Sequence, residues 1–238
     1  MIGLPSSSFP ARSLQARPME AIGHFGLPAL AIVLTLGPVF LQAPLVRFSP
    51  MGSALGTIPL LALALVLAFH PNPARQRVGT LLVGFAGSWL GGSLFWGWGR
   101  EYPFWHLPIE AFALPLAIGG LQTRWRLGAW FYLASLLGTA ATDGLIAVTG
   151  LMPLWPQVVQ ASPTEAGTLL QSAAQALLHP LPLLALALAG GWILLLARQL
   201  WQGDGASRVA AAALASTLVV DGLFFGAALL APHLSGLI

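Results

Sequence analysis

The sequence predicts an all-α fold, a bundle of seven helices that cross a lipid bilayer. Of its 238 residues, 57% are apolar and only 7% are charged, whereas about a quarter of the residues in a soluble domain are charged. The mean hydropathy is +0.81, and several apolar stretches approach the ~20 residues that a helix needs to cross a hydrocarbon layer. These observations exclude a water-soluble globular protein and favour one membrane domain.

Apolar runs bounded by arginine, proline or polar clusters define the predicted spans. The seven runs are Ile22–Val46, Ala54–Phe69, Val78–Trp96, Trp105–Leu121, Leu127–Thr149, Leu183–Trp201 and Val209–Leu230. The fourth is short and contains Pro108 and Pro115, which interrupt the hydrogen bonding of a helix. We expect a broken or re-entrant helix that needs protein or water around its free backbone groups. A bundle of six spans is the alternative.

The arginines, which supply all ten basic residues, predict the orientation. With a cytoplasmic N terminus, Arg47 and Arg100 fall in outer segments and the other eight fall in inner segments. Because cytoplasmic loops are enriched in arginine, this bias favours seven spans with the C terminus outside. The isoelectric point near 10.6 therefore reflects topology and not a nucleic-acid partner. The inner arginines are Arg12, Arg17, Arg75, Arg77, Arg124, Arg126, Arg198 and Arg208.

Small residues and prolines predict how the spans pack. Gly84, Ser88 and Gly92 recur every four residues along the third span. Small residues let helix backbones approach each other in lipid, where hydrophobic exclusion is lost. We therefore expect the third span to lie at the centre of the bundle. Pro28 and Pro38 should bend the first span.

Two segments lie outside the predicted spans. Residues 1–20 contain no apolar core, so we expect a flexible or surface-bound N-terminal segment, followed by one transmembrane domain over residues 21–238. The connection over residues 150–182 contains no arginine and is expected on the outer side of the membrane. Within it, Glu165–Leu178 is typical of an amphipathic helix at the interface, and an ordered loop covering the bundle is the alternative.

Polar residues converge on the outer half of the predicted bundle. Asp143 and Asp221 lie inside apolar helices, where an uncompensated charge costs ~2.5–3.5 kcal/mol. His106 and Glu110 are spaced i, i+4 and share a helical face. The topology predicts one outward-opening cavity among the third, fourth, fifth and seventh spans. Its candidate polar site comprises Arg100, Glu101, His106, Glu110, Asp143 and Asp221, with Ser135, Thr139 and Thr142 extending it along the fifth span.

Two interpretations of the buried acids are open. In the structural one, Arg100 pairs with Glu101 or Glu110, while protonated Asp143 and Asp221 donate hydrogen bonds between helices. In the functional one, burial in the membrane makes the acids binding sites for protons or cations. Both interpretations require the acids to face protein and not lipid.

Absent motifs exclude several activities. Cysteine is missing, which removes disulfides, thiolate catalysis and cysteine-bound metals. The five histidines show no His-x3-His or Glu-x2-His spacing, so no metal site is predicted. Phosphate-binding loops, dinucleotide fingerprints and serine-hydrolase elbows are also absent. No catalytic residue and no cofactor is assigned, although His24 or His179 would suit an axial ligand of a pigment.

The segment Trp96–Ala111, with the sequence WGWGREYPFWHLPIEA, resembles a family of uncharacterised integral membrane proteins from cyanobacteria whose domain has no known function. The resemblance implies a photosynthetic bacterium and a thylakoid or plasma membrane location. Within this segment, Leu107-Pro108-Ile109-Glu110 is similar to the Pro-x-Glu-Glu element of membrane lycopene cyclases, with Ala111 in place of the second glutamate. That likeness implies Glu110 as an acid that protonates a polyene.

Together these observations predict an integral membrane protein that carries a small solute or ion, or that serves as an accessory factor in a larger membrane complex. The lipid bilayer, and subunits of such a complex, are the expected partners. A membrane-embedded isoprenoid or lipid enzyme with Glu110 as its acid is one alternative. A pigment-binding protein is the other.

Overall fold

The computed structural model describes the backbone of residues 18–232 and the side chains of residues 26–232. Within this range the regular structure is entirely helical, which confirms the all-α part of the prediction. Arg12, Arg17 and most of the predicted N-terminal segment lie outside the described residues, as do the side chain of His24 and the chain after residue 232.

Six helices of the described chain are long and apolar enough to cross a membrane. They correspond to six of the seven predicted spans. α2 and α3 join end to end at Gly56 to form the second, and the π-helical turn η1 extends α4. The elements are α1 (Pro18–Phe48), α2 (Pro50–Leu55), α3 (Thr57–Ala68), α4 (Pro73–Leu94), η1 (Phe95–Gly99), α7 (Arg126–Val148), α10 (Pro180–Trp201) and α11 (Gly205–Leu230).

The predicted fourth span is a series of four short helical pieces, which we call the broken segment. Pro108 and Pro115 explain the interruptions, because proline lacks an N–H and tolerates only the first turn of a helix. Each α-helical piece therefore restarts around a proline, with a 3₁₀ turn between them. The pieces are η2 (Pro103–Trp105), α5 (His106–Glu110), η3 (Ala111–Ala113) and α6 (Leu114–Gly120).

α4 lies at the centre of the bundle, as its glycines predict. Half of the residues in its most apolar stretch are buried, against 11–22% in the other five long helices. At Gly84 a Cβ atom would lie 2.1 Å from the carbonyl oxygen of Gly128 on α7. Only glycine fits at this backbone crossing, and on the other flank Gly79 makes a similar approach to α3.

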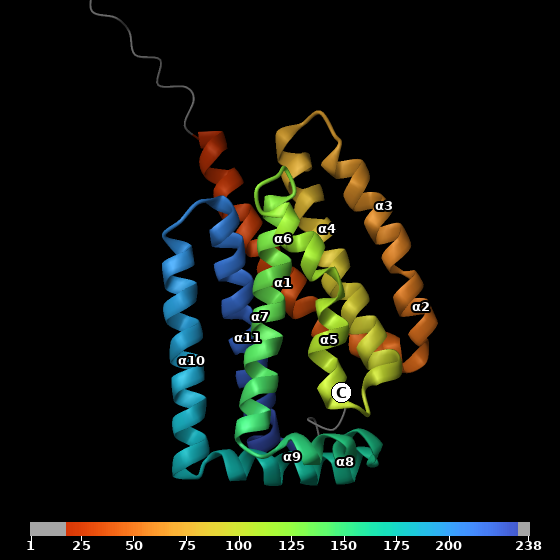
Figure 1. Cartoon of the computed structure of the whole chain (residues 1–238), viewed down its shortest axis with the longest axis vertical. Coiled ribbons are helices and arrows are strands. Elements are labelled where there is room, and N and C mark those ends of the chain that lie inside the picture. Colours follow the sequence, from red (N-terminus) through yellow and green to blue (C-terminus); the bar gives the residue numbers. More distant parts are fainter. Residues whose placement is uncertain (1–17, 233–238) are drawn as a thin grey trace, which may run out of the picture.

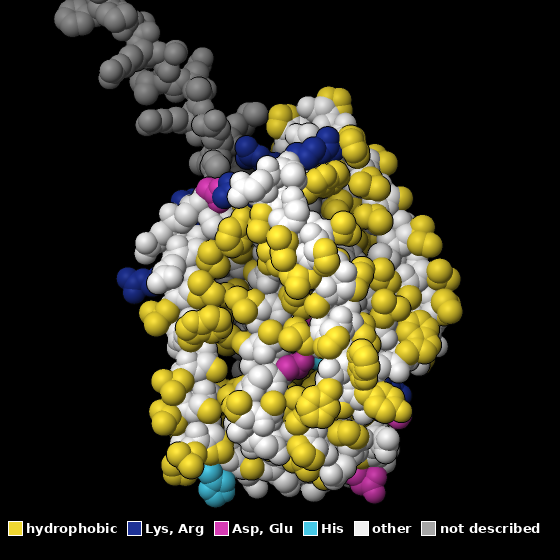
Figure 2. Space-filling model, viewed as in Figure 1, with side chains coloured by type: hydrophobic (Ala, Val, Ile, Leu, Met, Phe, Trp, Pro, Cys, Tyr) yellow, Lys and Arg dark blue, Asp and Glu magenta, His cyan; other side chains and the backbone are white. Residues whose placement is uncertain are grey.

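The chain passes back and forth between two ends of the bundle (Figure 1). The α3–α4, α6–α7 and α10–α11 connections lie at one end, which we call the arginine end. Figure 2 shows basic side chains gathered near it. The broken segment returns the chain from the far end of α4 to the start of α7. The arginines carried by these connections and the adjoining helix turns are Arg75, Arg77, Arg124, Arg126, Arg198 and Arg208.

Two helices cover the opposite end, which we call the α8–α9 end. η4 (Met152–Leu154) leads into α8 (Trp155–Gln160) and α9 (Pro163–Leu177), and both α-helices run across the axes of the long helices (Figure 1). α9 corresponds to the helix expected within the long connection. A capping box starts it: the Ser162 hydroxyl accepts from the Glu165 N–H, and the Glu165 carboxylate accepts from the Ser162 N–H.

Candidate functional site

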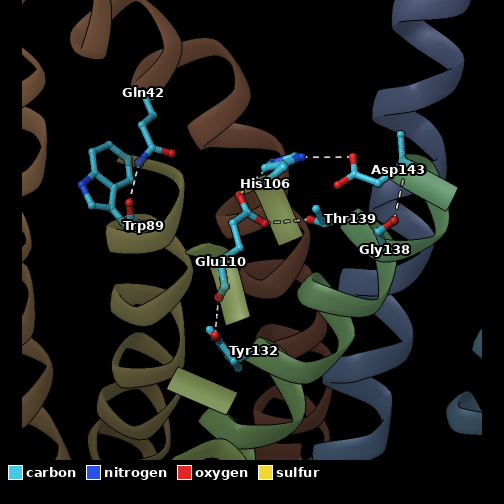
Figure 3. A network of polar contacts seen from close by, with 9 residues as sticks. Gln42, Trp89, His106, Glu110, Tyr132, Gly138, Thr139 and Asp143 are labelled. Atoms are coloured by element: carbon cyan, nitrogen blue, oxygen red, sulfur yellow. Dashed lines mark hydrogen bonds and ion pairs between the residues drawn. The ribbon is translucent and has the colours of Figure 1, made fainter. Parts of the chain in front are cut away.

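His106 lies between two carboxylates inside the helical bundle. Its Nδ1 is 3.0 Å from Oδ1 of Asp143 on α7, and its Nε2 is 3.3 Å from Oε1 of Glu110 one turn further along α5 (Figure 3). The three side chains are only 11–18% exposed. We call His106, Glu110 and Asp143 the triad.

Two hydrogen bonds between His106 and the carboxyl groups would require one proton more than a neutral imidazole carries. An ionised carboxylate only accepts hydrogen bonds, and a neutral imidazole has one donor and one acceptor nitrogen. Both contacts of His106 are therefore hydrogen bonds only when the imidazole is doubly protonated or when one carboxyl group carries a proton. With an imidazolium and two carboxylates the triad has a net charge of −1, and one further proton makes it neutral.

Tyr132 on α7 holds the backbone where the broken segment is interrupted. Its hydroxyl donates to the carbonyl oxygen of Glu110 and accepts from the N–H of Ala113 at 3.2 Å. Both groups belong to the 3₁₀ turn η3 that interrupts the segment, and buried backbone groups need partners in a membrane. Tyr132 is 3% exposed. The tyrosine therefore positions Glu110 by its main chain, while Thr139 donates to Oε2 of the same residue at 2.9 Å.

Aromatic rings cover the triad towards the α8–α9 end. The ring of Phe95, in the π-helical turn, stacks on His106 with 4.1 Å between ring centroids. The ring centroid of Trp155 lies 5.8 Å from that of the His106 imidazole, and the Trp155 indole stacks on Trp96. Its indole N–H donates to the carbonyl oxygen of Arg100 at 2.8 Å, which fixes the start of α8 against the end of η1. These rings form an aromatic cluster around His106.

Asp221 on α11 joins the triad through its neighbour on α7. The hydroxyl of Thr142 donates to Oδ2 of Asp221 at 2.8 Å, and Thr142 precedes Asp143 in the chain. The polar groups thus continue from the broken segment across α7 to α11.

The triad lies in the half of the bundle nearer the α8–α9 end. Asp143 precedes the last residue of α7 by five positions, and Asp221 precedes the last residue of α11 by nine. At 1.5 Å per residue, these positions are about 7 Å and about 13 Å from the helix ends. Figure 2 shows an acidic patch enclosed by apolar side chains at mid-height of the bundle, where α5 and α7 lie in Figure 1.

The structure brings four of the six predicted site residues together and leaves two apart. Glu101 is exposed and lines a separate, almost wholly apolar groove of about 430 Å³ with residues 102–105 and parts of η4 and α8. Arg100 faces a hollow that it shares with Arg47. Within the described residues Arg100 pairs with neither Glu101 nor Glu110, because Glu110 is held by the triad. Neither hollow is lined by a triad residue.

Sequence reasoning missed Tyr132 and the aromatic cover. A buried tyrosine on an apolar helix is typical of packing, and the sequence does not reveal the 3₁₀ turn whose two backbone groups its hydroxyl contacts. Among the described side chains, no set of three or more histidine, aspartate and glutamate residues is arranged to hold a metal ion. The triad and its neighbours present protonatable groups and hydroxyls.

Comparison with known proteins places the chain in a family. Residues 31–229, which include the whole triad, match the family described as "Protein of unknown function (DUF3120)". The chain belongs to this family. It matches no curated protein and no solved structure, so the likeness to lycopene cyclases has no support beyond its four residues. Family membership agrees with the resemblance in one respect, the unknown function, while origin in a photosynthetic bacterium stays a prediction.

Proposed function

We propose that the protein is an integral membrane carrier for a small solute or ion, and that the triad binds and releases a proton during transport. The observation that carries the proposal is His106 held between Glu110 and Asp143 within an apolar helical bundle. Ionisable residues inside membrane segments are rare, costly and concentrated on proton and substrate pathways. A bundle that needed only mechanical stability would not require three of them in contact.

The proposed topology has seven crossings, with the arginine end in the cytoplasm. Six crossings are the long apolar helices, and the broken segment is the seventh. Its interruption suits a crossing that lines a polar site, since irregular backbone at membrane depth is tolerated only where protein or water surrounds it. The distribution of arginines supports the orientation. α8 and α9 would then lie at the outer interface.

A proton cycle follows from the charges of the triad. In a low-dielectric site the neutral form, with one added proton, is favoured over the form with net charge −1. Loss of that proton leaves a negative charge that a cation or a polar solute stabilises. Thr142 and Asp221 extend the path for such a group from the triad towards α11. Proton binding and solute binding would therefore compete or alternate at one place.

The test measures proton movement in vesicles that contain the purified protein. A pH-sensitive dye in the lumen reports collapse of an imposed pH gradient, with a panel of inorganic ions, amino acids and organic acids added in turn. At least one solute should accelerate collapse with the wild type, and Asp143→Asn should abolish that acceleration. The matched control is Glu101→Gln, which removes an exposed acid outside the triad.

Infrared titration of the same samples provides a readout that needs no solute. The band of protonated carboxyl groups should change with pH in the wild type and lose part of its amplitude in Asp143→Asn but not in Glu101→Gln. Identical titrations of all three proteins, together with no accelerating solute, would overturn the carrier. Co-purification with a larger membrane complex would then favour the accessory role.

A further inference from the structure

The triad reaches the surface at the side of the bundle. Its side chains are 11–18% exposed, and Figure 2 shows an acidic patch at mid-height between α5 and α7 with apolar side chains around it. The acids carried by these two helices are Glu110 and Asp143. Neither of the two hollows described above is lined by a triad residue. The access to the triad that the structure shows is therefore lateral.

The surface around this opening is apolar and suits contact with lipid. Leu116, in α6, is 79% exposed, and Phe112, in η3, is 46% exposed. Asp143 lies about 7 Å inside the end of α7, a helix long and apolar enough to cross a membrane. In the proposed topology the opening therefore faces hydrocarbon. A molecule that reaches the triad from this side comes from the bilayer and must itself be soluble in it.

The charge of the triad selects a cation. The Glu110 carboxylate contacts His106 and Thr139, and the Asp143 carboxylate contacts His106. Two carboxylates around one imidazolium leave a net charge of −1, and ionisation of Asp221, beyond Thr142, would add to it. A neutral molecule or an anion would leave this charge uncompensated among apolar groups, which is costly. A cation beside the carboxylates removes that cost.

The other titratable groups of the surrounding described elements leave this charge in place. The hydroxyl of Tyr132 contacts the backbone at the end of α5. Arg126 starts α7 and is paired with an aspartate, and both arginines of α4 lie in its first two turns, at the arginine end. η1, η2, η3, α6 and α8 contain no titratable side chain. Arg100 and Glu101 line the two separate hollows.

We propose that the solute exchanged for protons is a lipophilic organic cation that enters the triad from the bilayer between α5 and α7. This inference rests on the proposed carrier function and names its substrate class. The exchange balances in charge: the neutral triad releases its added proton to water, and one cation of charge +1 takes the position beside the carboxylates. The apolar body of the cation lies against the apolar side chains of the opening. A small hydrophilic cation lacks that contact and must lose its hydration to enter.

The test measures cation binding and proton release with the purified full-length protein in detergent. Tetraphenylphosphonium is the lipophilic cation, tetramethylammonium the hydrophilic cation, and triphenylphosphine oxide the uncharged aromatic compound. In weakly buffered solution, tetraphenylphosphonium should release about one proton for each cation bound, so its apparent affinity should rise by as much as about tenfold per pH unit. The other two compounds should release no protons.

Variants assign the binding to the triad. Asp143→Asn should weaken tetraphenylphosphonium binding at least about thirtyfold and abolish proton release, because it removes one of the two negative charges. Glu110→Gln should do the same. The matched control is Glu165→Gln on α9, an exposed acid whose replacement retains the capping box; it should bind as the wild type does. The comparison of the three compounds on the wild type tests the proposal even where a variant fails to fold.

The outcomes separate this inference from the carrier itself. Equal proton release by tetraphenylphosphonium and tetramethylammonium would overturn entry from the bilayer. Binding that is lost in Glu101→Gln and kept in Asp143→Asn would assign the cation to the apolar groove and overturn the proposal. A triad that titrates in the infrared but releases no proton to tetraphenylphosphonium would overturn the substrate class and leave the carrier standing. A carboxyl band that does not change with pH would overturn both.

Discussion

Replacing Tyr132 by phenylalanine tests how the broken segment is held. The substitution removes one hydroxyl and leaves the volume of the ring, so no cavity term enters. The carbonyl oxygen of Glu110 and the N–H of Ala113 both lose their contact with that hydroxyl. Hydrogen bonds between helices in membrane proteins contribute about 0.6 kcal/mol on average and about 1.7 kcal/mol at most. For two such contacts we expect a loss of about 1–3 kcal/mol in the free energy of unfolding.

The assay is unfolding of the purified protein in mixed micelles by titration with a denaturing detergent. The chain contains only two tyrosines, and the other supplies a matched control: Tyr102 is 62% exposed, so Tyr102→Phe should leave the midpoint unchanged. The Tyr132→Phe midpoint should fall while the slope of the transition is retained. Equal midpoints for the two variants would refute the reasoning that the hydroxyl of Tyr132 completes the backbone of the broken segment.

Two further predictions concern the triad and the arginine end. A Cβ atom at Gly91 would lie 3.1 Å from Cα of Glu110. Gly91→Ala should therefore displace Glu110, lower the proton flux severalfold and cost about 1 kcal/mol of stability. The control is Gly119→Ala, where a Cβ atom has nothing within 4 Å; it should change neither vesicle transport nor the unfolding midpoint. At the N-cap of α11, the N–H of Ser207 lowers the pKa of Asp204, helped by the Ser207 hydroxyl and by the nearby guanidinium of α7. Because the folded pKa is depressed, this contribution is present above the unfolded value of about 3.9 and is lost as pH falls below it. Asp204→Asn keeps the helix cap, because asparagine also caps helices. It should reduce the loss of unfolding free energy at low pH by at most ~1 kcal/mol. The same loss at low pH in the variant and the wild type would contradict the assignment.

Much of the fold follows from local sequence because membrane spans depend on composition and length. The glycine spacing around Gly84 predicted a central α4, since close backbone approach needs small residues wherever it occurs. The prolines predicted that the segment around Pro108 would be interrupted. Boundaries were less predictable: the second long helix starts at Pro50 and not at Ala54, because Ser49 caps a short helix that precedes it.

The candidate site was predictable only in part. The spacing of His106 and Glu110 and the topology were enough to predict that both would lie near Asp143, and the triad contains these three. The position of Arg100 was not, because its neighbour Arg47 is distant in sequence and reaches it only through the packing of α1 on η1. Side-chain direction after a π-helical turn depends on the inserted residue, which the sequence pattern does not reveal.

All the α7 partners of α5 and η3 project from one strip of that helix. Tyr132, Thr139 and Asp143 are separated by seven and four residues, two spacings that return to the same side of an α-helix. Sliding α7 along its axis by one residue, about 1.5 Å, would lengthen all three contacts together. Imidazole, carboxyl and main chain would be released at once, so the three contacts form and break together.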